Sequence, residues 1–238
     1  MLFFTMLLNN ILFIYFAAAL LPALFLLGYV RSKERIHRTP WPVIRTLLWP
    51  GGLSAILASL IEWICHLFLG NQTFTGIGYL IYMILAVGLV EEGSKFLLLK
   101  HKTWDYPFFK TKYDGIVYSV CVGLGFAIFE NIKYIFTYGI GIAPMRALTA
   151  IPGHLSFAVI MGYFYGRARF YEDMGEHGRS VQSQILGLIC TAALHGFYDT
   201  AASINTTKGN LAFLFILIVV YVIIFRLVKH EANTDRII

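Results

Sequence analysis

The chain has 238 residues, of which 58% are apolar and only 13% are charged. A soluble domain carries about 25% charged residues, so this composition excludes an ordinary soluble enzyme and is typical of a chain solvated mainly by lipid. The net charge of +6 does not indicate a nucleic-acid partner, because the Lys and Arg residues lie in groups between apolar runs.

Seven apolar segments are long enough to cross a bilayer, which takes about 20 helical residues. They are continuous rather than alternating, which favours helices over barrel strands. The first is too long for a signal-peptide core and lacks a basic start, so we expect a retained helix. In chain order they are 2–30, 46–70, 77–99, 115–139, 147–166, 181–204 and 211–227. Their connections are short, so the sequence predicts an all-α, polytopic membrane bundle of about seven transmembrane helices, forming a single domain over 1–238.

The basic residues predict how this bundle is oriented. Of the 19 Lys and Arg residues, all but three lie at or just after the C-terminal ends of the first, third, fifth and seventh segments. Lys133, Arg146 and Lys208 are the exceptions. Because cytoplasmic connections carry an excess of Lys and Arg, we expect the N-terminus outside and the C-terminus in the cytoplasm.

Six ionisable side chains lie within apolar segments or at their edges. A charge at the centre of a membrane helix costs about 2.5–3.5 kcal/mol on insertion scales. Such side chains must therefore pair, change protonation or line a wet cavity, and they are candidates for function. The six are Glu91, Glu92, Glu130, His154, His195 and Asp199.

The spacing of these residues indicates possible partners. His195 and Asp199 are four residues apart on one helix face, so the carboxylate can orient the imidazole or simply stabilise the helix. Glu91 and Glu92 point about 100° apart, so one can face a cavity while the other is anchored to a neighbour. Lys95 lies three and four residues further on, where it can neutralise either glutamate.

The remaining candidates are ambiguous from spacing alone. Glu130 lies deep in the fourth segment, where a pair with Lys133 is possible. His154 lies at the predicted outer start of the fifth segment and could be a ligand or a satisfied polar residue. Glu62 and His66 are also four residues apart, and we predict a local pair near the outer surface.

Two histidines and several carboxylates on different helices can converge in one bundle. Histidine and carboxylate are the ligands that zinc takes at an open hydrolytic site, and a metal-bound water titrates near neutrality. A free glutamate can then act as general base. The same groups could also activate water without a metal, and the sequence leaves both possibilities open.

Four motifs, in this order along the chain, resemble those of the PrsW family. EEGSK at 91–95 resembles its EExxK motif, and FAIFEN at 126–131 resembles its FxxxE-type motif. His154, with Ala158, Gly162, Tyr163 and Gly166, is similar to the third motif, and HGFYD at 195–199 to the closing HxxxD motif. The resemblance covers roughly 77–202, which we expect to be the motif-bearing core.

The resemblance implies an intramembrane protease of the bacterial plasma (inner) membrane, distantly similar to CAAX prenyl proteases. Its implied substrate is a single-span, membrane-anchored anti-sigma factor, cut first in a regulated proteolysis cascade. Glu91 or Glu92 would activate water, and His154 and His195 would bind zinc or another divalent metal or stabilise the oxyanion. Asp199 would support His195. The expected metal ligands are His154, His195, Glu130 and Asp199, although CAAX prenyl proteases more often carry a histidine in place of Glu130.

The predicted helix limits place these residues at different depths. Glu91 and Glu92 fall nearer the cytoplasm, about 21 Å from the outer end of their helix, and the other four fall in the outer half of the bilayer. For the glutamates to be catalytic, the third helix must begin later, tilt, or bend near Gly88 or Gly93.

Two other functions remain compatible with the sequence. Buried carboxylates and histidines also build proton relays, so a proton-coupled transporter or channel is the alternative, although the inverted repeat that many transporters carry is not found. A membrane scaffold could bind a partner helix through Gly162 and Gly166. Close packing within the bundle is the more ordinary role of that spacing.

Overall fold

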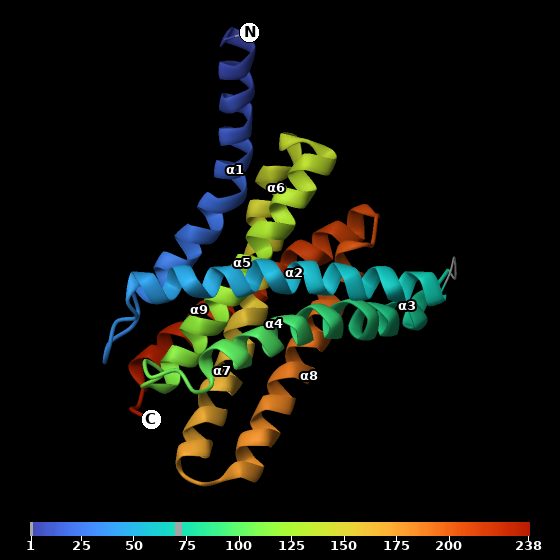
Figure 1. The fold of residues 1–238 in the computed structure, drawn as a ribbon. Coiled ribbons are helices and arrows are strands. Elements are labelled where there is room, and N and C mark those ends of the chain that lie inside the picture. Colours follow the sequence, from blue (N-terminus) through green and yellow to red (C-terminus); the bar gives the residue numbers. More distant parts are fainter. Residues whose placement is uncertain (1, 70–72) are drawn as a thin grey trace.

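The computed structural model describes residues 2–69 and 73–238, with side chains from residue 11 onward. The helices are α1 (Leu2–Arg31), α2 (Trp41–Leu69), α3 (Gly76–Tyr82), α4 (Leu89–Thr103), α5 (Lys112–Tyr138), α6 (Ala143–Leu148), α7 (Ala150–Asp173), α8 (His177–Ala202) and α9 (Thr207–Asn233) (Figure 1). A π-helix, η1 (Met83–Gly88), joins α3 to α4, and a 3-10 turn, η2 (Ile140–Ile142), precedes α6.

Within these described ranges, seven helical stretches are long and apolar enough to cross a membrane. Two are composite: α3, η1 and α4 form one stretch, and η2, α6 and α7 form another. The prediction of an all-α membrane bundle is confirmed. The helices extend beyond several predicted limits, as α2 does by beginning at Trp41, because polar and basic residues continue a helix past the end of its apolar window.

Helix α5 lies at the centre of the bundle and is buried over most of its length. It packs against α7, α2 and α1. Glycines let the α5 and α7 backbones approach closely, since a Cβ on Gly162 would lie 2.5 Å from the Cα of Ile116. A Cβ on Gly166 would lie 2.1 Å from the carbonyl oxygen of Lys112. The two glycines therefore pack within the bundle.

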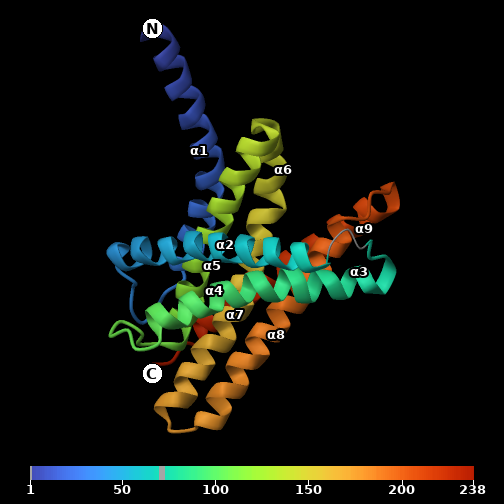
Figure 2. The same ribbon diagram turned by 45° about the vertical axis from the view of Figure 1, so that its right-hand side comes forward.

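The helices cross at wide angles rather than running parallel. In both ribbon views, α2 and the composite α3–η1–α4 stretch run across α5 and α7 (Figures 1 and 2). The composite stretch begins at Gly76, close to the predicted start at 77, so a later start does not resolve the conflict in depth. The stretch is inclined to α5 and α7 and contacts α8 through η1 and α4, so the glutamates lie beside α8 (Figures 1 and 2).

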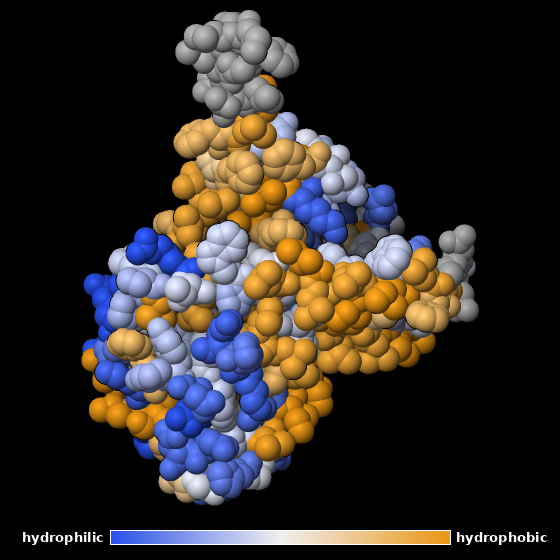
Figure 3. Space-filling view, in the orientation of Figure 1, coloured by the Kyte–Doolittle hydropathy of each residue, from blue (hydrophilic) through white to orange (hydrophobic). Residues whose placement is uncertain are grey.

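One end of the molecule is polar. The loops that join α1 to α2, α4 to α5 and α7 to α8 lie there together with the C-terminus (Figures 1 and 2). Hydrophilic residues gather over this end at the lower left of Figure 3, whereas much of the surface above and to the right is hydrophobic. This distribution suits a protein whose long helices are surrounded by lipid.

Candidate active site

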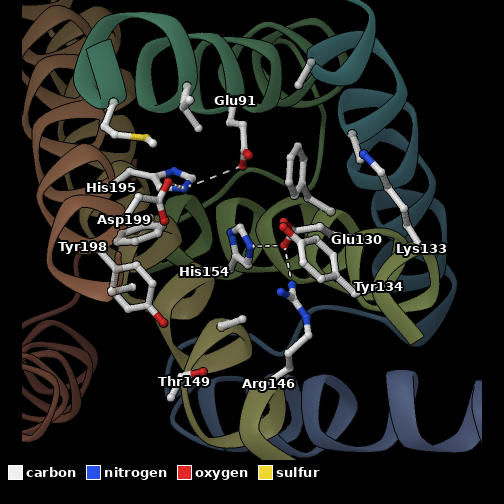
Figure 4. A pocket seen from close by; sticks show the side chains of 18 of the residues that line it. Glu91, Glu130, Lys133, Tyr134, Arg146, Thr149, His154, His195, Tyr198 and Asp199 are labelled. Carbon is white, nitrogen blue, oxygen red and sulfur yellow. Dashed lines mark hydrogen bonds and ion pairs between the residues drawn. The ribbon is translucent and has the colours of Figure 1, made fainter. Parts of the chain in front are cut away.

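A cavity of about 570 Å³ opens where α2, α5, α7 and α8 meet the composite stretch (Figure 4). Residues of α6 and α9 complete its wall. Five of the six ionisable residues singled out in the sequence line it: Glu91, Glu130, His154, His195 and Asp199. The sixth, Glu92, lies behind the wall, so the two adjacent glutamates have different surroundings.

The π-helix η1 brings the first turn of α4 against α8. A Cβ on Gly88, the last residue of η1, would lie 2.5 Å from the carbonyl oxygen of Ala192. Gly196 of α8 approaches the η1 backbone as closely, since its Cβ would lie 2.6 Å from the backbone nitrogen of Ile84. This contact of backbone on backbone places the two glutamates beside His195.

Glu92 is anchored on two sides and is only 1% exposed. Its Oε1 accepts a hydrogen bond from Lys95 Nζ at 2.7 Å and lies 2.8 Å from Nδ1 of His195. Since an ionised carboxylate can only accept, Nδ1 of His195 carries a proton. Glu92 therefore fixes the position of both partners.

Glu91 points into the cavity, as Figure 4 shows. Its Oε2 accepts from Lys95 Nζ at 3.2 Å and lies 3.8 Å from Nε2 of His195. A separation of 3.8 Å is too long for a direct hydrogen bond, but a single water can bond to both atoms. The pair can thus hold a water molecule at the cavity wall.

The His195 ring is held by contacts at both nitrogens and on one face. Its Nε2 lies 3.4 Å from Oδ2 of Asp199, one turn further along α8. Phe157 of α7 stacks on the ring, with centroids 4.5 Å apart and planes at 20°. The spacing of His195 and Asp199 in the sequence therefore corresponds to a real contact, and the imidazole is oriented before any substrate arrives.

His154 takes a second position on the cavity wall, opposite α8. Its Nε2 lies 2.8 Å from Oε2 of Glu130, and that same oxygen accepts from Arg146 at 2.7 Å. Its Nδ1 lies 3.3 Å from Lys95 Nζ. An ammonium can only donate, so Nδ1 is the acceptor and the proton of this imidazole lies on Nε2, which donates to Glu130.

One set of side chains in the described part of the chain could hold a metal ion. It is the only group of three or more His, Cys, Asp or Glu residues whose ligand atoms all lie within 4.8 Å of one another, namely Glu91, Glu92 and His154. One imidazole and two carboxylates fit zinc or another divalent ion. The ligand set predicted from the sequence does not gather around one point; it forms two separate pairs, His154–Glu130 and His195–Asp199.

The comparisons with known proteins agree with these motifs. A profile of the PrsW family of intramembrane metalloproteases matches residues 39–228. The chain belongs to the PrsW family. It is 33% identical to Protease PrsW of Clostridioides difficile (strain 630) over 227 residues, covering 93% of this chain and 89% of that protein. It is 31% identical to Protease PrsW of Bacillus subtilis (strain 168) over 183 residues, covering 77% and 80%. No solved structure matches the chain.

Membership of the PrsW family decides between the functions that the sequence left open. The protein is a multi-pass membrane enzyme of the protease class rather than a transporter or a scaffold. The family is described as one of metalloproteases, and the one ligand group described above could hold a metal ion. The identity of the metal and the roles of the individual residues belong to the proposal below.

Two cavity residues of this PrsW protein were missed by sequence reasoning. Glu62 does not pair with His66; it lines the cavity, and among the described residues its Oε1 is buried without a hydrogen-bond partner. Arg146, counted only as an outer basic residue, reaches Glu130 in place of Lys133. The available signal was its position: it is one of only three basic residues outside the predicted cytoplasmic groups.

Proposed function

We propose that this PrsW protein hydrolyses a single-span, membrane-anchored protein substrate, with water activated by Glu91. The observation that supports this most directly is that Glu91, and not Glu92, faces the cavity, 3.8 Å from His195 Nε2. An anti-sigma factor is the substrate we expect, and its cleavage would be the first cut of a proteolytic cascade at the bacterial plasma membrane.

The proposed reaction needs few movements of the protein. A water held between Glu91 Oε2 and His195 Nε2 loses a proton to Glu91 as its oxygen attacks the substrate carbonyl. His195, protonated on both nitrogens and flanked by Glu92 and Asp199, donates from Nε2 to the developing oxyanion. When the peptide bond breaks, the proton on Glu91 passes to the leaving amine.

The metal ion that the family description implies would be held by the group already described. We propose Glu91, Glu92 and His154 as its ligands, with one oxygen of Glu91 left free to act as the general base. A divalent ion there would supply Lewis-acid polarisation of the carbonyl or the water. Glu130 and Asp199 are then positioning residues, since Glu130 contacts Nε2 of His154 and Asp199 contacts Nε2 of His195. Carboxylates in that position fix the tautomer and the orientation of a histidine.

The size of the cavity limits how the substrate enters. One turn of a helix about 10–12 Å across fills roughly 500 Å³, so a cavity of about 570 Å³ holds little more than one turn of chain. We propose that a substrate helix unwinds locally before its backbone carbonyl reaches Glu91, because the carbonyls of an intact helix are hydrogen-bonded to its own N–H groups. We expect substrates with helix-breaking residues near the cut to be cleaved faster.

A cleavage assay in liposomes tests the proposal. Purified protein is reconstituted with single-span reporter proteins, anti-sigma factors among them, and the products are separated by mass. Glu91→Gln and His195→Ala should each lower the rate at least about 10²-fold, because general acid–base groups contribute about 10²–10⁴-fold. Glu176→Gln is the matched control, because Glu176 is partly exposed, does not line the cavity and pairs with Arg179 at 2.8 Å. Full activity of the Glu91 variant in correctly inserted protein would contradict the assignment.

A further inference from the structure

The centre of the proposed ligand group holds a side chain that is not a ligand. Lys95 Nζ lies 2.7 Å from Glu92 Oε1, 3.2 Å from Glu91 Oε2 and 3.3 Å from His154 Nδ1. Lys95 is 5% exposed, and its nitrogen also lies 3.8 Å from the centroid of the Phe126 ring. The three atoms that would bind a metal are therefore all hydrogen-bond acceptors for one ammonium.

An ammonium and a metal ion cannot share this position. Zinc lies about 2.0–2.2 Å from nitrogen and oxygen ligands, so an ion bound by all three atoms would be in contact with Lys95 Nζ. Two cations at that separation repel strongly at low dielectric. The ammonium would also lose the acceptors that compensate for its burial, because their lone pairs would point to the metal.

We propose that Lys95 is a built-in competitor for the metal, whose ammonium occupies the metal position and leaves it when a divalent ion binds. This rests on the ligand group of the proposed function, and it adds a role for the lysine of the EEGSK motif. While no metal is bound, Lys95 holds the two carboxylates of Glu91 and Glu92 together without their mutual repulsion. Its departure is part of the free-energy change of metal binding, so the lysine weakens the site's affinity.

The geometry gives Lys95 somewhere to move. Lys95 does not line the large cavity but lines a separate void of about 10 Å³ together with Ser119. A void of that size is at the lower limit for one water molecule. A small shift of the flexible stem toward Ser119 would open the space between Glu91, Glu92 and His154.

Metal binding to purified full-length protein in detergent tests the competition without any substrate. Co²⁺ is the probe, because its visible absorption reports ligation, and equilibrium dialysis gives the stoichiometry and Kd. Lys95→Met removes the ammonium and keeps the stem, and it should bind one equivalent of Co²⁺ at least about 10-fold more tightly than wild type. Lys133→Met is the matched control, since Lys133 lines the cavity without touching the ligand group, and it should bind as wild type does.

Four further outcomes decide the proposal. Adding His154→Ala to Lys95→Met should abolish the gain in affinity, and Co²⁺ should raise the Tm of Lys95→Met more than that of wild type. An unchanged or higher Kd for Co²⁺ in Lys95→Met overturns the competition. If Lys95→Met folds only with Co²⁺ present, the metal has replaced the ammonium, as proposed.

A second variant, whose side chain is neutral but still donates a hydrogen bond, separates loss of the ammonium from simple misfolding. Lys95→Gln should also bind Co²⁺ more tightly than wild type, and failure of both variants to fold even with Co²⁺ would show that a metal cannot take the place of the ammonium. Cleavage by the wild-type protein is measured separately. If wild type cleaves substrate but Lys95→Met binds Co²⁺ no more tightly, the competition alone is refuted. If Lys95→Met binds Co²⁺ more tightly but wild type cleaves no substrate, the proposed function is refuted.

Discussion

Two side chains of the same chemistry have different roles at the residue scale because a helix turns by about 100° per residue. Glu91 faces the cavity, and Glu92 faces Lys95 and His195 inside the protein. The sequence predicted that the two would diverge, but it could not rank them, because the rotation of a helix about its axis depends on neighbours that the local spacing does not reveal.

We predict that replacing Glu92 lowers the stability of the protein more than replacing Glu91 does. Glu92→Gln should lower the free energy of unfolding by about 3 kcal/mol or more, because removing one charge from a buried ion pair leaves the other uncompensated. Glu91→Gln should lose cleavage with a smaller loss of stability, since its side chain borders the cavity. Thermal unfolding in detergent, followed by circular dichroism, measures the difference. Equal Tm values for Glu92→Gln and wild type would remove the anchoring role.

The six ionisable candidates could be recognised from sequence because charge is costly in lipid, and all six lie at or just behind one cavity. The partners of these residues could not be predicted in the same way. Arg146 reaches Glu130 across 16 residues, and Glu62 reaches the cavity from α2. Both contacts depend on how separate helices cross, which a pattern within one segment does not encode.

At the scale of elements, the crossing of α3–η1–α4 with α8 builds the site. The sequence located the composite span correctly to within a few residues, and it identified Gly88 as one place where a bend could resolve the conflict in depth. The π-helix itself was not predicted, because its hydrogen-bond pattern has no signature in hydropathy. Its tight contact with α8 depends on Gly88 and Gly196 having no side chains.

Gly88 and Gly93 lie five residues apart, and replacing each by alanine gives a matched test of the contact between η1 and α8. Gly88→Ala should lower the cleavage rate by about 10-fold or more. The new Cβ would lie 2.5 Å from the Ala192 carbonyl oxygen and would push the glutamates away from His195. A misplacement of about 1 Å can lower a catalytic rate about 10²-fold. Gly93→Ala, where a Cβ meets nothing within 4 Å, should keep full activity and gain about 1 kcal/mol of stability. Liposome cleavage rates and Tm values check both variants. Equal activity of the two would mean that the contact does not align the site.

At the scale of the whole molecule, the polar end and the apolar flanks agree with the segment pattern read from the sequence. The number and the type of the spans could be predicted because a bilayer requires long apolar helices. The wide crossing angles could not, since they depend on small residues that meet between helices, as Gly51 of α2 and Gly125 of α5 do.

A labelling experiment tests the predicted orientation of the bundle in the membrane. In a variant whose three cysteines are replaced by alanine, a new cysteine at Asn205 should react with a membrane-impermeant maleimide in intact cells. A new cysteine at Glu176, in the loop between α7 and α8, should react only after the cells are opened. Asn205 is exposed and Glu176 is partly exposed in the structure. The opposite pattern would place the N-terminus in the cytoplasm and would contradict the distribution of Lys and Arg as a guide to topology.

The π-helix also makes the site sensitive to helical phase. A π-turn accommodates one residue more than the α-helix around it, so the same residues wound as an α-helix would turn α4 by about 100° relative to α3. With α3 held in place, that rotation would bring Val90 to the orientation that Glu91 now has, and Glu91 to that of Glu92. The extra residue in η1 thus decides which side chain faces the cavity, and a one-residue deletion that restores a regular α-helix should leave Glu91 in its place.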